Sequence, residues 1–325
     1  MSKKKVGLWF YTNENGYVIR QQIIEKLQEQ HIEVIYDFDM RECYCFNGEV
    51  YTKDDLNLSK LDAFFFMNAE ERNDHQNDIL KALDKSGVII SNQVESYLYA
   101  NDKFTANTIL RQNGINVAES MLIPFHFNQK KINKIFNRWR SVIVKPRDKI
   151  CAIGIMKFDD PEKFYDFYLF AKEHVPNLYI EQYIPFEKRD TRVEIFDGKV
   201  VGEGFARIMN HSFKTNVRAG GKATFIPAEE DSKITAIAAA KALGINATIV
   251  DLVRHSETKE PYVLEVNPFL GVFYGAHFES LGERSPQHFT DIDQLKIRLI
   301  VEHILKLLST EYQQRHEVLA KAIDG

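Results

Sequence analysis

The chain has 325 residues, of which 44% are hydrophobic and 27% charged, and its net charge is −4 at pH 7. The length exceeds that of one small domain, and the composition excludes disordered and fibrous proteins. A nucleic-acid-binding protein usually carries a basic excess, which this chain lacks. No apolar run reaches the ~20 residues of a membrane-spanning helix, and the N-terminus lacks the apolar stretch of a secretion signal. We therefore expect a cytoplasmic protein of two or three lobes that partners neither nucleic acid nor a membrane.

The first hundred residues alternate between apolar strands and amphipathic helices, the pattern of a parallel sheet with covering helices. The continuous apolar run of residues 61–67 predicts a buried strand, and Gly87 closes the helix before the next strand. The other expected strands are 5–11, 33–37 and 88–90, and the expected helices are 17–30, 76–85 and 102–112.

Cys43, Cys45 and Cys151 are an odd number of cysteines in a long chain, which argues against a disulfide framework. The pair Cys43 and Cys45 invites a zinc-site interpretation. No second Cys or His pair follows at the spacing of zinc ligands, so we expect ordinary thiols in a reducing compartment.

The middle of the chain contains a hairpin around Asp197-Gly198, a dipeptide that favours the type I′ turn. With a two-residue loop, Phe196 faces Lys199, and counting outward puts Arg192 opposite Glu203. One face of the hairpin then carries the charged side chains Arg192, Glu194, Glu203 and Arg207. The other elements expected nearby are strands 142–146, 153–158 and 178–184 and a helix over 161–174.

The last third of the chain begins with a helix that Ser232 is expected to cap and Gly244 to end. Two apolar strands follow over residues 247–253 and 262–266, and residues 292–323 have a helical period. The loop between the two strands places Asp251 almost opposite Glu265, and Asn267 falls on the same face as Glu265. Two carboxylates and an amide suit Mg²⁺ with phosphates as co-ligands. An ion pair to a local Lys or Arg, or an outward polar face, explains the same pattern.

Phosphate also requires positive charge, and two lysines occupy structurally fixed positions. Lys103 starts a helix, and Lys145 ends the apolar strand Val142-Ile143-Val144. A solvated or snorkelling lysine is the alternative for either residue.

Taken in order, these segments resemble the ATP-grasp superfamily, and within it the RimK-like carboxylate–amine ligases, which are related to glutathione synthetase. The resemblance extends over residues 91–271 and rests on a series of motifs: Ser91-Asn92, Asn101-Asp102-Lys103, Val142-Ile143-Val144-Lys145-Pro146, Tyr179-Ile180-Glu181-Gln182-Tyr183-Ile184, Asp190-Thr191-Arg192-Val193, Arg207, Phe213-Lys214-Thr215-Asn216, Gly220-Gly221, Val250-Asp251-Leu252 and Leu264-Glu265-Val266-Asn267. The resemblance implies an ATP-grasp fold of class α/β with α+β lobes. It divides the chain into an N-terminal α/β domain (1–100), a central lid lobe (101–184) and a C-terminal lobe with the metal hairpin (185–325).

The resemblance also implies roles for individual residues. ATP phosphates are bound by Lys103 and Lys145, and the ribose is held by Asp190. The adenine-binding hinge, with backbone contacts from its second and fourth residues, consists of Glu181, Gln182, Tyr183 and Ile184.

Further implied roles concern the reaction. Arg192 lies near the phosphates, while Arg207 and Asn216 stabilise the acyl phosphate and its tetrahedral successor. Mg²⁺, or Mn²⁺ in its place, is held by Asp251, Glu265 and Asn267.

The implied function is an ATP- and Mg²⁺-dependent ligase that joins a carboxylate to an amine through an acyl phosphate, with an amino acid or a peptide as substrate. A second hypothesis of the same chemistry is modification of a peptide or protein tail, by adding residues or by closing side-chain amides or esters. Two alternatives of other classes are a nucleotide-binding protein without turnover and an ATP-grasp kinase. Relatives are commonly homo-oligomers, and the resemblance extends that expectation to this chain.

Two segments depart from the family pattern. The phosphate-covering loop is usually rich in glycine, which lets backbone N–H groups approach phosphates, but here Lys149 and Ala152 occupy positions expected to be glycine. Phe269 stands after the Asn267 motif where small residues are usual, which predicts a reshaped substrate pocket.

Overall fold

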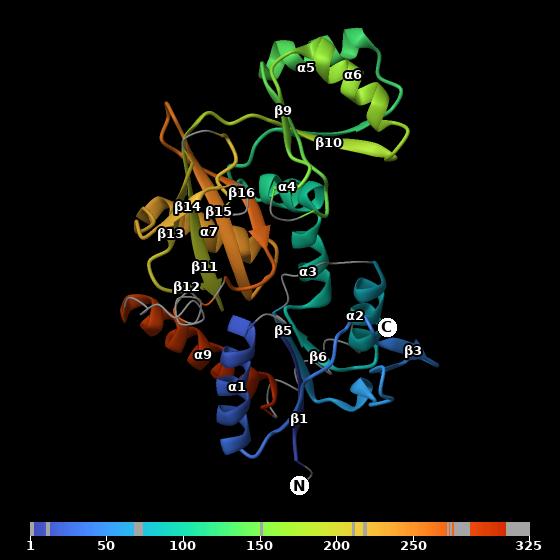
Figure 1. Cartoon of the computed structure of the whole chain (residues 1–325), viewed down its shortest axis with the longest axis vertical. Helices are drawn as coiled ribbons and strands as arrows, with labels where there is room; N and C mark the ends of the chain where they lie inside the picture. The colour runs from blue at the N-terminus through green and yellow to red at the C-terminus, as the bar shows by residue number, and fades with distance from the viewer. Residues whose placement is uncertain are drawn as a thin grey trace. The chain divides into compact units, whose positions relative to one another are not determined.

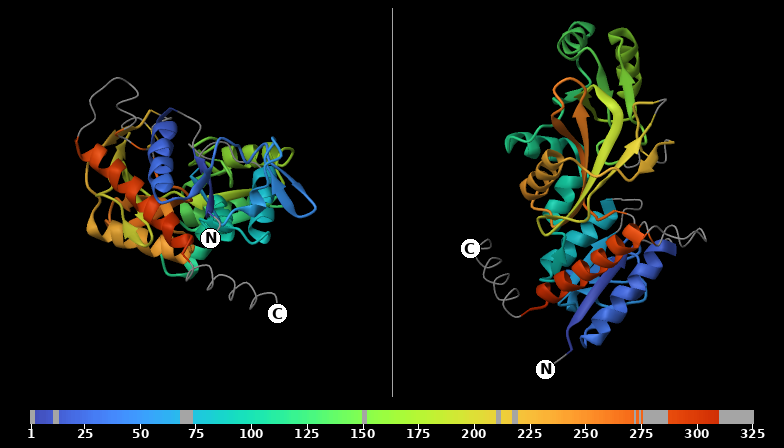
Figure 2. Two further views of the ribbon diagram at one scale, coloured as in Figure 1. Left: turned by 90° about the horizontal axis from the view of Figure 1, so that it is seen from below. Right: turned by 90° about the vertical axis from the view of Figure 1, so that its left-hand side faces the viewer.

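The chain folds into two compact units in its computed structural model (Figures 1 and 2). The first unit combines Met1–Glu95 with Phe269–Gly325, and the second comprises Ser96–Pro268. The structure describes residues 3–10, 14–67, 74–149, 152–209, 212–216, 220–271, 273, 275 and 287–309. The domain boundaries expected at residues 100 and 184 remain predictions.

A four-stranded parallel sheet with the order β2-β1-β5-β6 forms the centre of the first unit. Every residue of β5 is buried, as the apolar run of residues 61–67 predicted. Helix α9 packs against α1 and β5 (Figure 1). The expected alternation of strands and helices is confirmed. The elements are β1 (Lys5–Phe10), α1 (Glu14–Glu29), β2 (Glu33–Ile35), β3 (Tyr44–Phe46), β4 (Glu49–Tyr51), η1 (Leu58–Lys60), β5 (Ala63–Met67), α2 (Asp74–Lys85), β6 (Ile89–Ser91) and α9 (Gln287–Leu307).

The second unit contains two antiparallel sheets, of which the first has the order β7-β10-β8-β9. Helices α5 and α6 pack on it around a core that includes Ile132, Phe136 and Phe164 (Figure 1). Helix α6 starts where Asp160 caps it and Pro161 fixes its first turn. The elements are α3 (Val94–Asn101), α4 (Lys103–Gln112), β7 (Ser120–Pro124), α5 (Gln129–Trp139), β8 (Val142–Val144), β9 (Met156–Phe158), α6 (Pro161–Ala171) and β10 (Asn177–Gln182).

The other sheet of this unit has the order β14-β13-β11-β15-β16, with β12 paired to β11. Alternate residues of β11 point to opposite faces, so Val193 and Ile195 join the core with Ala236 of α7. Arg192 is on the opposite face, which is the face of the candidate site. The elements are β11 (Phe186–Phe196), β12 (Lys199–Val200), β13 (Phe205–Ile208), β14 (Lys222–Thr224), α7 (Glu230–Ala242), β15 (Ala247–His255) and β16 (Pro261–Asn267).

The hairpin around Asp197-Gly198 confirms one prediction and corrects another. Both turn residues have positive φ, 45° and 75°, and Phe196 pairs with Lys199 as expected. The pairing then breaks after β12, so Arg192 lies opposite Phe205 and the predicted pairing with Glu203 is wrong. Glu203 instead forms an ion pair with Lys233 of α7. Because the slip is two residues, which preserves the faces of a strand, Arg192 and Arg207 still share a face.

The expected Ser232 cap is also wrong, because helix α7 starts at Glu230 and its N-cap residue is Glu229, three residues before Ser232. Asp231 in the first turn accepts a hydrogen bond from the Ser232 N–H at 2.8 Å, where a carboxylate also favours the positive end of the helix. Gly244 ends the helix with φ +66°, as predicted.

Three remaining expectations concern the whole chain. Cys43 and Cys45 are free thiols, whereas Cys151 lies outside the described residues. Helix α9 covers part of the expected C-terminal helix, and residues 310–323 of that prediction lie outside the described part. Among the described helices, none has both the length and the apolar character that crossing a bilayer requires.

Candidate active site

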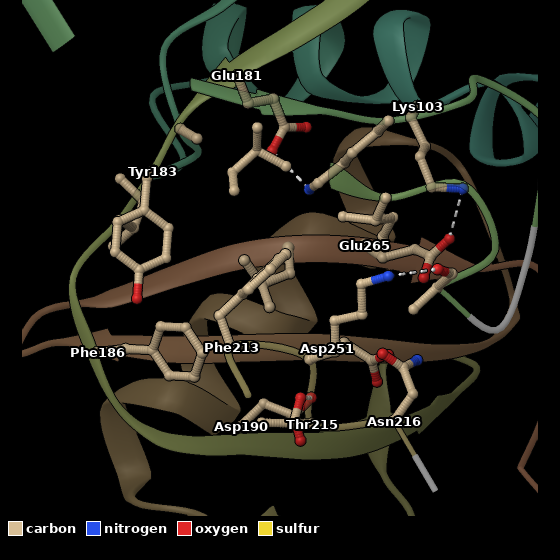
Figure 3. Close-up of a pocket in the computed structure, with 18 of the residues that line it drawn as sticks. Lys103, Glu181, Tyr183, Phe186, Asp190, Phe213, Thr215, Asn216, Asp251 and Glu265 are labelled. Atoms are coloured by element: carbon tan, nitrogen blue, oxygen red, sulfur yellow. Dashed lines mark hydrogen bonds and ion pairs between the residues drawn. The ribbon is translucent and has the colours of Figure 1, made fainter. Parts of the chain in front are cut away.

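Residues of both sheets of the second unit line one pocket, which is partly open to solvent (Figure 3). Its lining includes five lysines or arginines and four carboxylates. Two residues predicted for the site, Arg192 and Asn267, lie outside the lining. The predicted residues that line the pocket are Lys103, Lys145, Glu181, Gln182, Tyr183, Ile184, Asp190, Arg207, Asn216, Asp251 and Glu265.

Each predicted phosphate lysine is paired with a carboxylate. Lys103 follows the N-cap Asp102 of α4, and its Nζ lies 2.9 Å from Glu265 Oε1 and donates to the Lys149 carbonyl at 2.5 Å. Lys145 follows β8, and its Nζ lies 2.5 Å from Glu181 Oε2. Burial favours the neutral form of Glu265, but the charges of Lys103 and Lys145 and the hydrogen bond from Lys103 together outweigh it and lower the pKa of that carboxyl.

The side chain of Glu181, the first residue of the predicted hinge, is buried and bonded within the protein. It is 5% exposed, and its Oε1 accepts a hydrogen bond from the Tyr179 hydroxyl at 2.7 Å. The Gln182 N–H donates to the Glu119 carbonyl at 2.8 Å. Only the carbonyl of Gln182 is therefore left to make the expected backbone contact with a base. Among the described residues, no backbone carbonyl accepts from the Ile184 N–H.

Aromatic rings form the opposite end of the pocket. The centroid of the Tyr183 ring lies 6.3 Å from that of Phe186 and 6.4 Å from that of Phe213. Figure 3 shows Tyr183 and Phe186 across the pocket from Lys103. Sequence analysis assigned no role to Phe186 or Phe213. Their positions in the sequence could have indicated a role, since Phe186 follows the predicted hinge closely and Phe213 is the first residue of the motif that contains Asn216.

A buried network joins two arginines to two aspartates. Strand register places Asp190 opposite Arg207 and Arg192 opposite Asp251. Arg192 binds both carboxylate oxygens of Asp251, at 2.8 and 2.9 Å, and Arg207 binds Asp251 Oδ2 at 2.9 Å. Arg207 also binds both oxygens of Asp190, which accepts a further hydrogen bond from Thr215. A ribose at Asp190 would therefore have to displace existing bonds.

The pKa values of the two aspartates of this network are shifted in opposite directions. Burial raises the pKa of Asp190 despite its bonds to Arg207. Burial acts on Asp251 in the same direction, but Arg192 and Arg207 together outweigh it and hold the pKa of Asp251 below its ordinary value.

The predicted metal hairpin has the expected register, with Asp251 opposite Glu265 and Asn267 opposite Ile249. A bulge after Asp251 shifts the pairing of the following residues. The amide Nδ2 of Asn267 is buried with no hydrogen-bond partner among the described atoms. The three side chains offer oxygen donors, the type that Mg²⁺ prefers, although both oxygens of Asp251 already accept from arginines. The described residues contain no group of three or more His, Cys, Asp or Glu that could hold a metal ion.

In the loop that is expected to cover the phosphates, one residue that is not glycine has a backbone conformation typical of glycine. Ala152 has φ +58°, a value that favours glycine, and its carbonyl accepts from Lys214 Nζ at 3.5 Å. The neighbouring Ile150 and Cys151 lie outside the described residues. The pattern therefore shows why glycine is expected at residue 152.

The comparisons with known proteins agree with this geometry. The RimK-like ATP-grasp domain matches residues 100–274, which is more than half of the chain. The chain belongs to the RimK-like ATP-grasp family. The ATP-grasp fold is also found in a RimK domain protein from Sphaerobacter thermophilus, with a TM-score of 0.64 at 13% identity over 93% of this chain and 99% of that one. A D-alanine–D-alanine ligase from Bacillus anthracis, complexed with ATP, gives a TM-score of 0.59 at 16% identity over 93% and 99% of the two chains. The expected fold class is confirmed.

Curated relatives of this RimK-like protein include glutamate ligases. A tetrahydromethanopterin:alpha-L-glutamate ligase from Methanosarcina acetivorans is 24% identical over 79% of this chain and 84% of its own. A probable alpha-L-glutamate ligase from Methanococcoides burtonii is 25% identical over 60% of this chain, and the match spans 64% of the relative's length.

Proposed function

We propose that this RimK-like protein is an ATP- and Mg²⁺-dependent carboxylate–amine ligase that forms an amide bond through an acyl phosphate. The observation that carries the proposal is the pocket itself. It has an aromatic end suited to a base and a charged end with Lys103, Lys145 and Arg207, which suits phosphates. The pocket lies within a RimK-like ATP-grasp domain.

Nucleotide binding would replace the carboxylate partners of two lysines with phosphates at the charged end of the pocket. Lys103 and Lys145 both line the pocket, where they are held by Glu265 and Glu181. Polyphosphate oxygens would compete with these carboxylates for both lysines. Tyr183, Phe186 and Phe213 would cover the base, and the Ile184 N–H, which no backbone carbonyl of the described residues accepts, would donate to it.

Glu265 and Asn267 are the proposed Mg²⁺ ligands, with Asp251 sharing its oxygens between the ion and Arg192. When bound, the ion would offset the negative charge of the phosphates. The release of Lys103 from Glu265 by a phosphate would free the carboxylate that the metal requires.

The proposed reaction has two steps. A substrate carboxylate oxygen attacks the γ-phosphorus of ATP, the bond to ADP breaks, and an acyl phosphate forms. The amine nitrogen then attacks the acyl carbon, phosphate leaves with its electron pair, and the nitrogen loses a proton to the solvent. Arg207 and Asn216 would stabilise the charge that develops on the acyl oxygen, and Lys103 and Lys145 that on the phosphates.

The substrates are proposed to be amino acids or peptides, since the named relatives include glutamate ligases and a D-alanine–D-alanine ligase. Modification of a peptide or protein tail uses the same chemistry and is the second candidate. Phe269 is in the first unit, and its expected effect on the substrate pocket remains a prediction.

Phosphate release with Mg·ATP should therefore require both a carboxylate and an amine, tested on paired panels of amino acids and short peptides with the product read by mass. Glu265→Gln should lower turnover by about 10²–10³ because the metal loses its charged ligand. ATP binding without release of ADP on any panel would favour a binding protein. A stable phosphorylated product formed without an amine would favour a kinase.

Gly221→Ala should lower kcat by about tenfold to 10² while the protein stays folded. A Cβ at this position would lie 1.9 Å from the Thr215 carbonyl oxygen, and the Gly221 N–H donates to the Asn216 carbonyl at 3.1 Å. The substitution must therefore move the segment that carries both residues. Steady-state kinetics and thermal unfolding check this prediction, with Gly198→Ala as a control for backbone strain outside the pocket, since Gly198 has φ +75° and a Cβ there meets nothing within 4 Å. Unchanged kinetics would remove this segment from the site.

A further inference from the structure

A second surface of the same unit is strongly basic, although the chain as a whole is acidic. Helix α5 and the end of α4 line a groove with four cations, Arg111, Lys131, Lys134 and Arg138. We call it the α5 groove. From residue 129 to residue 140 the sequence contains no acidic residue. Such a local concentration of positive charge attracts anionic partners.

One acidic side chain, Glu119, lies within the groove and orders one of its cations. Arg138 donates to both carboxylate oxygens of Glu119, at 2.7 and 2.6 Å, and the Trp139 indole N–H donates at 2.6 Å. These bonds lower the pKa of Glu119 to about 2, so it is ionised at neutral pH. Lys131 and Lys134 are exposed, and no ion pair to either is found among the described residues.

Strand β7 contributes Ser120 and Met121 to the groove, and it is an edge strand. The Gln182 N–H bonds to the Glu119 carbonyl, so the alternation of an antiparallel ladder directs the backbone of Met121 and Ile123 toward β10. The backbone N–H and C=O of Leu122 therefore point outward. No strand of the described residues pairs with this outer edge, which is a template for an added strand.

We propose that the α5 groove docks an extended acidic polypeptide, which adds a strand to the outer edge of β7 and pairs its carboxylates with Lys131 and Lys134. The apolar side chain of Met121 in the lining would contact its uncharged side chains. The proposed ligase function is not needed for this binding, because the groove lies outside the pocket.

Nucleic acid fits this surface less well. The aromatic rings that a single strand would stack on are already engaged. Trp139 is 6% exposed, and Lys131 Nζ lies 4.7 Å from the centroid of the Phe127 ring. A membrane surface also fits less well, because the apolar face of α5 is buried in its own core and cannot insert into lipid.

The position of the groove relates it to the candidate active site. Gln182 lines the pocket, and its N–H bonds to the residue that precedes β7. A strand added beyond β7 would lie two strand spacings, roughly 10 Å, from β10. A docked polypeptide would thus be held near the pocket, which favours a polypeptide over a free amino acid as one substrate.

The test is fluorescence anisotropy of the full chain with a labelled decapeptide of alternating Glu and Val. The double variant Lys131→Glu/Lys134→Glu should weaken binding at least about tenfold, whereas Lys130→Glu, an exposed residue of the same helix outside the groove, should change it less than about twofold. Binding should weaken as salt rises. Thermal unfolding and ATP binding of each variant confirm that the fold is intact.

A second pair of variants tests the added strand. Leu122→Pro removes an outward N–H without touching the ladder to β10, so it should weaken the peptide about tenfold, whereas Leu122→Ala keeps the N–H and should bind within about threefold of the unmodified protein. Equal binding by Lys131→Glu/Lys134→Glu and the unmodified protein would overturn the proposal. So would tighter binding of an alternating Lys-Val decapeptide, a ten-nucleotide thymidine strand or phosphatidylserine vesicles than of the acidic peptide.

Discussion

Lys145→Met is expected to reduce ADP release by about 10²–10³. The lysine is 9% exposed and is held by Glu181 at 2.5 Å, so its charge is fixed at the pocket where we propose the phosphates bind. Methionine keeps the length of the side chain and removes the charge. ADP release under saturating substrates, together with ATP affinity by calorimetry, measures the loss.

A fall in stability could produce the same result, because Lys145→Met leaves Glu181 buried without its cation, which typically costs about 3–5 kcal/mol. The double variant Lys145→Met/Glu181→Gln removes both charges and keeps the hydrogen bond that Tyr179 donates. It should recover most of the free energy of unfolding but not the turnover. Recovery of turnover in the double variant would show that Lys145 acts on stability alone.

Asp251→Asn should destabilise the protein by about 3–5 kcal/mol, because Arg192 and Arg207 lose the carboxylate they share in a buried site. Chemical unfolding measures this change. Glu265→Gln is the matched control, since its side chain is 24% exposed and its ion pair is with Lys103 alone among the described pairs. It should lose turnover with a much smaller change in stability.

Asp251→Asn should also alter how the free energy of unfolding changes with pH in acid. The folded-state pKa of Asp251 lies below its unfolded value, so its contribution is present above the unfolded pKa and is lost as pH falls through the folded pKa. Asp251→Asn has no such loss, so its stability should fall less steeply below about pH 4. Burial raises the pKa of Asp190, which gives its contribution to stability the opposite sign. The charge of Asp251 adds a smaller part of that rise, and only this part is lost in the variant. Equal slopes for the two proteins in acid would contradict this account.

The hairpin of β15 and β16 illustrates how far local pattern reaches. Its two apolar strands and short loop allowed one register, and Asp251 pairs with Glu265 as predicted. In the hairpin of β11 and β12, the first two pairs agree with the predicted register, but the pairing beyond them is shifted by two residues. Gly202 and Gly204 have φ of 69° and 73°, and the Ala228 N–H bonds to the Glu203 carbonyl. That irregular segment depends on a partner 25 residues away in the chain, which local pattern does not contain.

Side-chain partners were still harder to foresee. The motifs assigned Asp190 to a ribose and Asp251 to a metal, yet both carboxylates bind Arg207. Strand order decides this, because β11 lies between β13 and β15 and brings three separate segments onto one face. The basic α5 groove escaped notice for the same reason, since its charges come from α4, α5 and the edge of β7.

Residue types and spacing alone established the alternating N-terminal sheet, the turn at Asp197-Gly198, the metal-hairpin register and the resemblance to ATP-grasp ligases. These features depend on neighbours in the chain, where steric limits and the period of a strand or helix act directly. The pairing of Lys145 with Glu181, the Arg207 network and the free edge of β7 emerged only on folding. They depend on which strands become neighbours, and burial then makes the pairing of every charge obligatory.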